Sequence, residues 1–423
     1  MTTIEKTVTD ICAEAKAASR ELAVLDTETK NAALNAIADA LDANAEQIIA
    51  ANERDLEAGR ESGLEPALMD RLKLDAERLA SIADDVRKIV TLEDPVGREI
   101  REFTMYNDLE VRKIAVPLGV IAVVYEARPN VTIDAAALCL KSGNAIVLRG
   151  SSIAMHSNAV LAQVAREAIA TVGVPEAAIS IVSGGDRDEL RELGTQEGVV
   201  DLIIPRGGEG LKHTLKAVAT VPVIYAAAGN CHVYVDATAD LDAAEEIIIN
   251  SKIQRPGVCN AAETLLVHQE IAAEFLPRAL KALASGGVEL HGDQQARELA
   301  GADAGEIVEA TEEDWSTEYL DLVLAVKVVD STETAIDHIN TYGTGHSEAI
   351  VTGSDESAAA FTGRVDSACV YVNAATRFTD GGEFGYGAEI GISTQKLHAR
   401  GPIALRELCS YKYIVQGDGQ TRG

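Results

Sequence analysis

Apolar residues recur three and four positions apart from about residue 3 to residue 90, the spacing that places them on one face of a helix. Two stretches show the pattern most clearly, with apolar side chains at Ala32, Leu34, Ile37, Ala38 and Leu41 and again at Leu79, Ile82, Val86 and Ile89. The pattern predicts a cover of amphipathic helices that ends before Asp94 and Pro95. From 101 to 114 polar and apolar residues alternate, which predicts an extended hairpin arm that contacts a partner.

Short apolar runs alternate with helical stretches between 119 and 226. We predict strands at 120–124, 145–148, 179–182, 202–204 and 221–224, and helices at 133–140, 154–171, 188–193 and 210–218. Strands that alternate with helices form a parallel sheet, because each helix returns the chain to the same end of the sheet. Ligands of such sheets bind at the carboxyl ends of the strands.

A second α/β unit is predicted from Cys231 onward. Its strands are expected at 233–235, 264–267, 322–329 and 369–372, and its helices at 243–249, 271–283 and 332–339. The tail regains strand character at 405–409 and 412–415. We expect this tail to pair with the 101–114 arm across a subunit boundary.

The acidic excess limits the partners of the chain. Its 67 acidic and 37 basic residues give a formal charge of -30, which repels the phosphate backbone of nucleic acids. A site for an anionic cofactor or substrate must therefore be built from local arginines and backbone amides. The six cysteines are scattered without a CxxC pair, which is typical of a reduced cytoplasmic protein and not of metal or disulfide sites. No secretory signal or membrane-spanning run is predicted.

Three glycine-containing turns follow predicted strands, with the sequences RGSS at 149–152, SGG at 183–185 and PRGG at 205–208. None has the GxGxxG fingerprint of a Rossmann pyrophosphate site. Each glycine alone is ordinary turn chemistry, but an arginine at a strand end suits bidentate binding of a phosphate. Arg149 is the better candidate of the two arginines, because the hydroxyls of Ser151 and Ser152 follow it in the sequence.

A lone cysteine stands in the sequence QRPGVCN at 254–260. Because a proline–glycine pair precedes Cys259 and a strand-like run follows it, the thiol is predicted to lie on a loop. Two interpretations are open: a small buried hydrophobic side chain, the usual fate of a cysteine, or a nucleophile. Asn130, which follows the first predicted strand, presents a similar choice. Its amide donates to an oxyanion or caps the next helix, and local spacing favours the cap.

The order PLGV at 117–120, GNAIVLRGSS at 143–152, IPRGG at 204–208 and then the loop cysteine resembles the aldehyde dehydrogenase superfamily. Four longer blocks extend the resemblance over nearly the whole chain: VVYEARPNVT at 123–132, QRPGVCNAAETLLVH at 254–268, VDSTETAIDHINTYGTGHSEAI at 329–350 and VNAATRFTDGGEFGYGAEIGISTQK at 372–396. The N-terminal helices are the least diagnostic part. The blocks are similar to those of the branch that reduces glutamyl 5-phosphate in proline biosynthesis.

The resemblance implies an α/β fold like that of aldehyde dehydrogenases, with two parallel-sheet domains and a small β oligomerisation arm. It assigns 1–100 and 115–228 to a nucleotide-binding domain with an N-terminal helical cover, and 229–375 to a catalytic domain that carries the nucleophile loop. The oligomerisation arm and tail comprise 101–114 and 395–423. Residues 376–394 are expected to return the chain to the nucleotide-binding domain.

The resemblance also implies roles for individual residues. Cys259 is the nucleophile, and Asn130 acts with the Cys259 amide as an oxyanion donor. Arg149 takes the position of the superfamily's cofactor-ribose lysine, where its extra donors favour the 2′-phosphate of NADP. The other cofactor-binding candidates are Ser151, Gly184, Pro205, Arg206, Gly207 and Glu318. The last of these matches the glutamate that holds the nicotinamide ribose, with an exposed surface glutamate as the alternative.

Two residues are candidates for substrate binding. Arg255 pairs with the leaving phosphate or braces the loop, and His346 lowers the pKa of the thiol, contacts the substrate or is structural. The general-base glutamate of hydrolytic members is missing, because the corresponding segment reads AAAGNCH at 226–232. Without a group that activates water, a thioacyl enzyme is not hydrolysed readily, which favours an acyl phosphate as the substrate.

The resulting prediction is an NADPH-dependent oxidoreductase that converts glutamyl 5-phosphate to glutamate 5-semialdehyde and phosphate through a Cys259 thioester. We expect a cytoplasmic homo-oligomer that is functionally associated with glutamate 5-kinase and has no metal, nucleic acid or membrane partner. The first alternative is a hydrolytic semialdehyde dehydrogenase, which does not need phosphate. The second is a nucleotide-binding scaffold that has lost catalysis, and the intact Cys259 and Asn130 argue against it.

Overall fold

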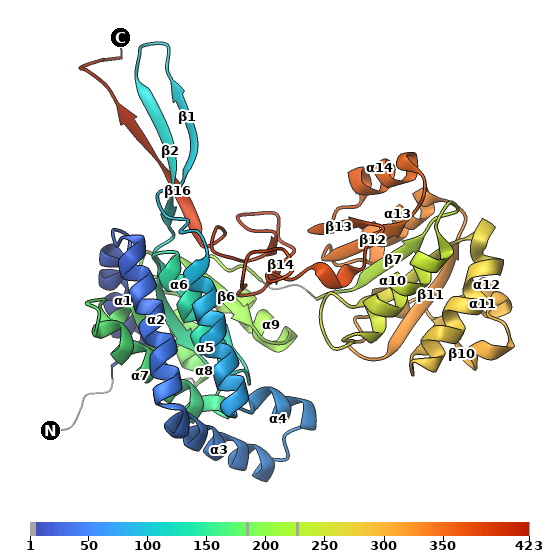
Figure 1. Ribbon diagram of the computed structural model, residues 1–423, viewed down its shortest axis with the longest axis horizontal. Helices are drawn as coiled ribbons and strands as arrows, with labels where there is room; N and C mark the ends of the chain where they lie inside the picture. Colours follow the sequence, from blue (N-terminus) through green and yellow to red (C-terminus); the bar gives the residue numbers. More distant parts are fainter. Residues whose placement is uncertain (1–5, 183–185, 226–227, 423) are drawn as a thin grey trace. The chain divides into compact units, whose positions relative to one another are not determined.

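The computed structural model describes residues 6–182, 186–225 and 228–422. The chain divides into two compact units (Figure 1). Unit 1 comprises Met1–Ala226, Gly385–Gly391 and Ile403–Gly423, and unit 2 comprises Ala227–Phe384 and Ile392–Pro402. Each unit has its own sheet and its own core.

The sheet of unit 1 has four parallel strands in the order β5-β4-β3-β6. They are β3 (Val120–Tyr125), β4 (Ala145–Arg149), β5 (Ile179–Val182) and β6 (Leu202–Arg206). Every residue of β3 is buried, as expected of a central strand that is covered on both faces. The chain runs outward from β3 through β4 to β5 and then returns to place β6 on the other side of β3. The strand order therefore reverses between β3 and β6, the position at which open α/β sheets bind ligands.

The predicted strand at 221–224 is wrong. This segment makes only one isolated parallel bridge, between Ile203 and Val223. Pro222 has no backbone N–H to continue a ladder, so the contact with β6 stops there. Pro205 lies inside β6 because this strand is at the edge of the ladder, where a missing N–H is tolerated.

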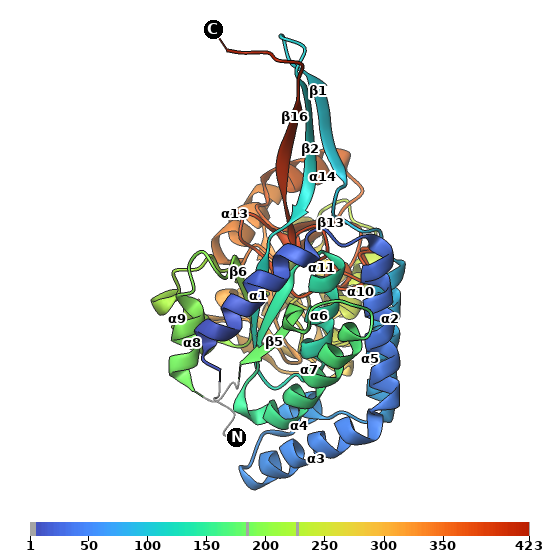
Figure 2. The ribbon, with the colours of Figure 1, turned by 90° about the vertical axis from the view of Figure 1, so that its left-hand side faces the viewer.

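Helices cover the sheet of unit 1 (Figure 2). α6 (Asn130–Lys141), α7 (Met155–Ala170), α8 (Arg187–Gly194) and α9 (Glu209–Val218) alternate with the strands as predicted, together with the short 3₁₀ turns η1 (Ser152–Ala154) and η2 (Glu176–Ala178). The predicted N-terminal cover consists of α1 (Val8–Leu22), α2 (Thr27–Ala43), α3 (Ala45–Glu61), α4 (Pro66–Leu72) and α5 (Ala76–Thr91). α1 packs on β4 and β5, and α2 packs on α5 and α7. Aspartate caps at Asp26 and Asp75 satisfy backbone N–H groups at the starts of α2 and α5.

A three-stranded antiparallel arm belongs to unit 1. It consists of β1 (Glu99–Thr104), β2 (Glu110–Pro117) and β16 (Cys409–Gln416), in the order β1-β2-β16, and it projects away from the rest of the unit (Figure 1). The hairpin prediction is confirmed. The tail prediction is partly wrong, because residues 405–408 form a turn and the strand starts only at Cys409. The predicted pairing of tail and arm is made within one chain and not across a subunit boundary.

The sheet of unit 2 has seven parallel strands in the order β10-β9-β11-β8-β7-β12-β13. They are β7 (Cys231–Val235), β8 (Ala262–His268), β9 (Glu289–Gly292), β10 (Ile307–Glu309), β11 (Val323–Val329), β12 (Ser347–Val351) and β13 (Cys369–Val372). The four predicted strands are present, and β9, β10 and β12 are additional. A two-stranded sheet of β14 (Ile392–Ser393) and β15 (Gly401–Pro402) completes the strands of this unit.

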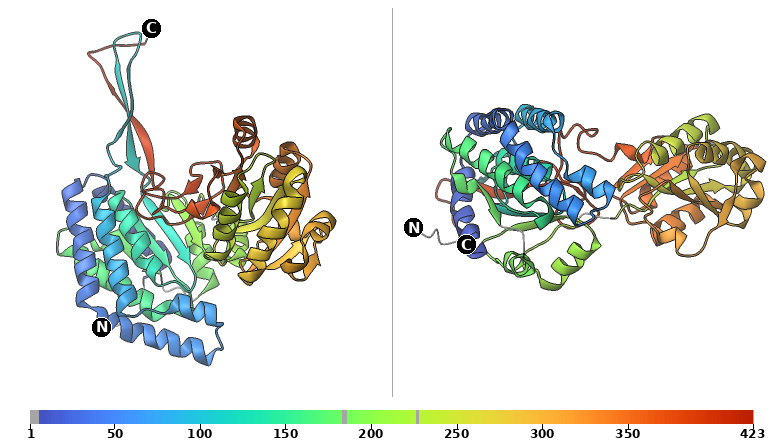
Figure 3. Two further views of the ribbon diagram at one scale, coloured as in Figure 1. Left: turned by 45° about the vertical axis from the view of Figure 1, so that its right-hand side comes forward. Right: turned by 90° about the horizontal axis from the view of Figure 1, so that it is seen from below.

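Helices lie on both faces of this sheet (Figure 3). They are α10 (Leu241–Ile253), α11 (Gln269–Ser285), α12 (Gln294–Leu299), α13 (Thr332–Tyr342) and α14 (Asp355–Arg364), with short 3₁₀ turns η3 (Ala302–Ala304), η4 (Asp314–Ser316) and η5 (Thr376–Phe378). Alternate residues of β7 point to opposite faces. Val233 and Val235 join the core under α10 and α11, while Tyr234 joins the core under α13 and α14. This two-sided core holds the loop between α10 and β8, which carries Cys259.

Within the described residues no helix is long and apolar enough to cross a membrane. The same part of the chain holds no group of three or more His, Cys, Asp and Glu side chains arranged to bind a metal ion.

Candidate active site

The Cys259 loop connects α10 to β8 and is half-buried in unit 2. Its backbone packs closely on Gly229, where an added Cβ would lie 1.5 Å from the Cys259 carbonyl oxygen. The Sγ of Cys231 donates to the same oxygen over 3.2 Å. Burial raises the pKa of the Cys231 thiol well above its usual value, so this neighbour stays protonated and acts as a donor. Cys259 therefore lies on a loop, as predicted, and its backbone position is closely defined.

Residues 376–379 form several hydrogen bonds to the Cys259 loop. The side-chain amide of Asn260 donates to the carbonyls of Thr379 (2.9 Å) and Arg377 (3.2 Å). The hydroxyl of Thr376 donates to the Asn260 carbonyl over 2.6 Å, and the Thr376 N–H donates to the Ser251 hydroxyl over 3.3 Å. Three of these four bonds involve Asn260, the residue after the thiol, on its backbone or its side chain, so they restrict how the loop can move.

An ion pair buried beneath the loop joins its two ends. Lys252 in the last turn of α10 and Glu263 in β8 meet at 2.6 Å, and both side chains are completely buried. Burial lowers the pKa of Lys252 and raises the pKa of Glu263 to about 7. The second oxygen of Glu263 accepts the N–H of Leu320 over 3.2 Å. Because Glu263 has no exposed surface, it is a structural carboxylate and not a base that could activate water at Cys259.

Glu318 forms a hydrogen bond with Gly229. One of its carboxylate oxygens accepts the Gly229 N–H over 2.5 Å, and its side chain is only partly exposed. This position argues against the alternative of an unconstrained surface glutamate. It links the predicted ribose-binding carboxylate to the residue against which the Cys259 loop packs.

His346, which directly precedes β12, is completely buried. Its Nδ1 lies 2.8 Å from the Ser347 hydroxyl and 3.8 Å from the Cys231 Sγ. Burial lowers the pKa of His346 to about 4, so the ring is neutral at pH 7 and does not supply a positive charge to a thiolate. These observations favour the structural role over contact with substrate.

Asn130 is the first residue of α6 in unit 1. Pro129 occupies the N-cap position, and no side chain caps this helix, so the N-cap interpretation of Asn130 is wrong. The Nδ2 of Asn130 instead donates to Asp134 over 2.8 Å, one helical turn further on. Burial raises the pKa of Asp134 to about 7. The bond to a carboxylate fixes which end of the amide is the donor and leaves the second N–H of Nδ2 for another acceptor.

The strand-end arginine and serine predicted to bind cofactor lie at the carboxyl end of β4. Arg149 donates from one terminal nitrogen to the Asp186 carbonyl over 2.9 Å, and burial lowers its pKa. Among the described residues, Arg149 Nε and Ser151 Oγ are buried without a hydrogen-bond partner. Orphaned buried donors require a partner, and these two fit a ligand that supplies oxygen acceptors.

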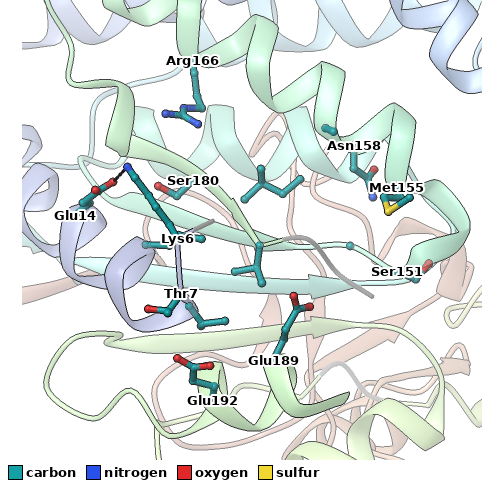
Figure 4. Close-up of a pocket in the computed structure, with 16 residues that line it drawn as sticks. Lys6, Thr7, Glu14, Ser151, Met155, Asn158, Arg166, Ser180, Glu189 and Glu192 are labelled. Atoms are coloured by element: carbon teal, nitrogen blue, oxygen red, sulfur yellow. Dashed lines mark hydrogen bonds and ion pairs between the residues drawn. The ribbon is translucent and has the colours of Figure 1, made fainter. Parts of the chain in front are cut away.

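A cavity of about 700 Å³ opens beside these residues (Figure 4). Gly150 and Ser151 after β4, Met155 at the start of α7 and Val182 at the end of β5 line it, together with Thr7 at the start of α1. One part of the cavity lies at the carboxyl ends of β4 and β5, where open parallel sheets bind ligands. The rest extends along β5 past Ser180 and Ile181, and the carboxylates of Glu14, Glu189 and Glu192 line it. The volume is within the range of small-molecule sites.

The turn after β6 lies at the reversal of strand order. The carboxylate of Glu126, which follows β3, accepts the Gly208 N–H over 3.0 Å. An added Cβ at Gly207 would lie 2.7 Å from the Glu126 carboxyl carbon, so a larger residue there would displace the Glu126 side chain from this turn. Pro205 is buried in β6, and Arg206 is half-buried at its end. Gly184, the remaining candidate, lies outside the described residues.

The sequence interpretation missed Asp134, Glu126 and Arg377. The four-residue separation of Asn130 and Asp134 on one helix face was a usable signal. Glu126 acts on a turn 82 positions away, and Arg377 is brought to the Cys259 loop only by folding, so no local pattern marks either residue.

The fold and the site define a class of protein that comparison with known sequences identifies. Residues 2–300, more than half of the chain, match the model of the aldehyde dehydrogenase family. An acetylating aldehyde dehydrogenase from Geobacillus thermoglucosidasius shares the fold, with a TM-score of 0.69 at 22% identity over 98% of this chain and 97% of that one. The chain therefore belongs to the aldehyde dehydrogenase family, which implies a nicotinamide cofactor and a small-molecule substrate.

Within the family, relatives that match this chain over its full length carry a more specific name. Gamma-glutamyl phosphate reductase of Thermobifida fusca is 54% identical over 422 residues, covering 100% of both chains. The protein of the same name from Clostridium novyi is 53% identical over 420 residues, covering 99% of this chain and 100% of that one. The crystal structure of gamma-glutamyl phosphate reductase from Thermotoga maritima superposes with a TM-score of 0.96 at 44% identity, covering 99% of this chain and 100% of that one.

Proposed function

We propose that this chain reduces gamma-glutamyl phosphate to glutamate 5-semialdehyde with release of phosphate, the second step of proline biosynthesis. The observation that carries the proposal is the full-length similarity to gamma-glutamyl phosphate reductases, at 54% identity without terminal gaps in coverage. The closely held loop that presents a half-buried thiol is consistent with it.

Cys259 acts as the nucleophile in this proposal. Its thiolate attacks the acyl carbon, a C–S bond forms, and the C–O bond to the phosphate breaks with the electron pair leaving on inorganic phosphate. The product is a thioester on Cys259. Asn130 and the Cys259 N–H are proposed to donate to the oxyanion of the tetrahedral intermediate. Asp134 would hold the Asn130 amide so that its N–H groups and not its oxygen serve this purpose.

The nicotinamide cofactor is proposed to occupy the cavity at the carboxyl end of β4. Arg149 and Ser151 would hold it with their orphaned donors, Arg206 and Gly207 would line its path at the reversal of strand order, and Glu318 would bind a ribose hydroxyl. When bound, the cofactor supplies the hydride that reduces the thioester to the aldehyde. NADP is proposed over NAD because the guanidinium of Arg149 suits a 2′-phosphate.

The sequence-derived domain roles are proposed as well. Residues 1–100 and 115–228 would bind the nucleotide, 229–375 would carry the chemistry, and 376–394 would lead back to the nucleotide-binding part. The arm at 101–114 and the tail at 395–423 would mediate homo-oligomerisation, which the exposed edges of this sheet and the exposed side chains of Tyr411 and Tyr413 support. The cytoplasmic location and the association with glutamate 5-kinase are predictions from the resemblance alone.

The reverse reaction provides the test. Purified protein with glutamate 5-semialdehyde and NADP should form NADPH only when inorganic phosphate is added, and Cys259→Ala should reduce the rate to the background of the assay. Cys409→Ala, which removes a buried thiol from unit 1, is the matched control and should retain activity. NADPH formation that does not need phosphate would instead support the hydrolytic alternative. Inactivity of the wild-type protein with every aldehyde would support a scaffold.

A further inference from the structure

Two arginines lie beside the nucleophile in a chain whose formal charge is -30. Arg255 is exposed on the Cys259 loop itself. Arg377, in the short turn η5 (Thr376–Phe378), is half-buried and reaches the loop from a distant part of the sequence. Neither residue is needed to attack the acyl carbon or to bind the cofactor in the scheme above.

The position of Arg377 is fixed from both ends. Its carbonyl accepts from the side chain of Asn260, the neighbour of the thiol. Its Nε donates to the Gln254 side-chain oxygen over 2.8 Å, at the beginning of the loop. The remaining four N–H groups of a guanidinium are on its two terminal nitrogens. The residue is therefore attached to the loop at its backbone and at the base of its guanidinium.

The surroundings of Arg377 work against its positive charge. Burial lowers the pKa of its guanidinium, and the neighbouring charge of Arg255 lowers it further. The carboxylate of Asp380 acts in the opposite direction and raises the pKa of Arg377. Two like charges at a partly desolvated position repel one another, so the arrangement gains stability when an anion of more than one negative charge lies between them.

We infer that Arg255 and Arg377 together form an anion subsite that holds the phosphate of the acyl phosphate during attack by Cys259. The inference rests on the proposed function and adds Arg377 to the single arginine that the sequence suggested. It also resolves the choice for Arg255 in favour of phosphate binding over bracing of the loop.

The competing anion on this substrate is its carboxylate, which is a poorer match. A phosphate can carry two negative charges and accepts from two planar guanidinium groups, whereas a carboxylate carries one charge and is satisfied by one bidentate arginine. The phosphate is also attached to the carbon that the thiol attacks, while the carboxylate is several bonds further along the substrate. Arg255 lies on the same loop as the thiol, and Arg377 contacts Asn260, the next residue after it. The two arginines are therefore positioned for the phosphate and not for the carboxylate.

The kinetic test uses Arg255→Gln, Arg377→Gln and the double variant in the reverse reaction, with separate titrations of phosphate and semialdehyde. Each single substitution removes charged hydrogen bonds and should raise KM for phosphate about 10- to 100-fold, with KM for the semialdehyde changing less than about twofold. Arg377→Lys keeps the charge and should recover part of the loss. Arg364→Gln is the control, because it removes the same charge from an exposed position on α14 in the same unit.

The outcomes separate the inference from the proposed function. A raised KM for the semialdehyde with an unchanged KM for phosphate would assign the pair to the substrate carboxylate and overturn the inference, and so would no change in either constant. If the wild-type protein shows no phosphate-dependent activity, the proposed function is overturned instead.

A second measurement does not depend on turnover. Inorganic phosphate should slow alkylation of Cys259 by iodoacetamide in the wild-type protein, and Arg377→Gln should require about tenfold or more phosphate for the same protection. Arg255→Gln, which changes an exposed side chain, keeps this test available if Arg377→Gln fails to fold. Protection that is equal in the wild type and in both variants would refute the anion subsite.

Discussion

Replacing Gly229 with alanine should damage catalysis more than it damages the fold. The new Cβ would lie 1.5 Å from the Cys259 carbonyl oxygen, 2.4 Å from the carbonyl carbon and 2.7 Å from the Cα. Unstrained non-bonded contacts are near 3.5 Å, so the atoms must separate by roughly 2 Å. All three of these contacts are with the backbone of the nucleophile loop, which has no flexible side-chain end that could move aside.

Both sides of this contact are held by hydrogen bonds, so relieving it must displace the nucleophile loop as well as residue 229. The Gly229 N–H is bonded to Glu318. The next residue, Asn230, is completely buried and donates from its side chain to the carbonyls of Trp315 (2.8 Å) and Tyr342 (2.9 Å). Misplacement of a reacting group by about 1 Å can cost about 10²-fold in rate. We therefore expect kcat to fall by at least about 10²-fold, with a loss of about 1–3 kcal/mol in the free energy of unfolding from overpacking.

Steady-state rates of the reverse reaction, the rate of Cys259 alkylation and urea unfolding measure the three consequences of Gly229→Ala. The control is Gly363→Ala, because Gly363 is exposed in α14 and an added Cβ there meets no atom within 4 Å. That change should leave kcat unchanged and stabilise the helix by up to about 1 kcal/mol. If Gly229→Ala keeps kcat and the alkylation rate within twofold of the wild type, the loop is not positioned by this contact and the reasoning is refuted.

Three further predictions concern the buried charges and the cofactor. Lys252→Met leaves Glu263 buried without its partner and should cost about 3–5 kcal/mol in urea unfolding, most of which the double variant with Glu263→Met should recover; equal stability of both variants would contradict this. Asp134 has a folded-state pKa of about 7, above its ordinary 3.8, so it stabilises the fold most below pH 4 and loses that contribution as the pH rises through 7. Asp134→Asn should therefore flatten the pH dependence of stability between pH 4 and 7, and an unchanged curve would be inconsistent with this burial. Arg149→Gln should raise the Kd for NADPH about tenfold with little effect on the Kd for NADH, measured by fluorescence titration; equal losses would separate Arg149 from the 2′-phosphate.

Most strands of the two parallel sheets could be predicted because they are buried and mainly apolar. β3, β4, β5, β7 and β8 are short buried runs that alternate with longer helices, and this alternation is visible without tertiary information. β12 was missed because it begins with buried polar residues. Glu348 in this strand accepts from the backbone N–H of His232 over 2.7 Å and lies 3.0 Å from its ring, a partner 116 positions away. Before folding brings this partner close, the segment has the polar character of a loop.

The residues of the candidate site also differ in whether the sequence alone could predict them. The loop position of Cys259 follows from the local Pro256–Gly257 break, so it could be predicted. The cap interpretation of Asn130 failed because the helix begins one residue earlier, with Pro129 at the N-cap, and the Asn130 side chain donates to Asp134. Arg377 reaches the loop through hydrogen bonds that span more than 110 positions, and no periodicity or motif spacing carries that information.

The division of the chain between its two units has a consequence for how the protein is made. The backbone passes from one unit to the other near residues 226, 385, 392 and 403, so no single cut separates two complete domains. Unit 1 begins with the first helices, yet its arm is complete only when β16 pairs with β2, about 300 positions upstream. During synthesis the arm therefore stays incomplete, with one edge of β2 unpaired, until the whole of unit 2 has emerged from the ribosome. A chaperone that shields this edge should raise the yield of the full-length chain. Expression of residues 1–226 or 227–384 alone, each of which is an incomplete unit, should give aggregation-prone material.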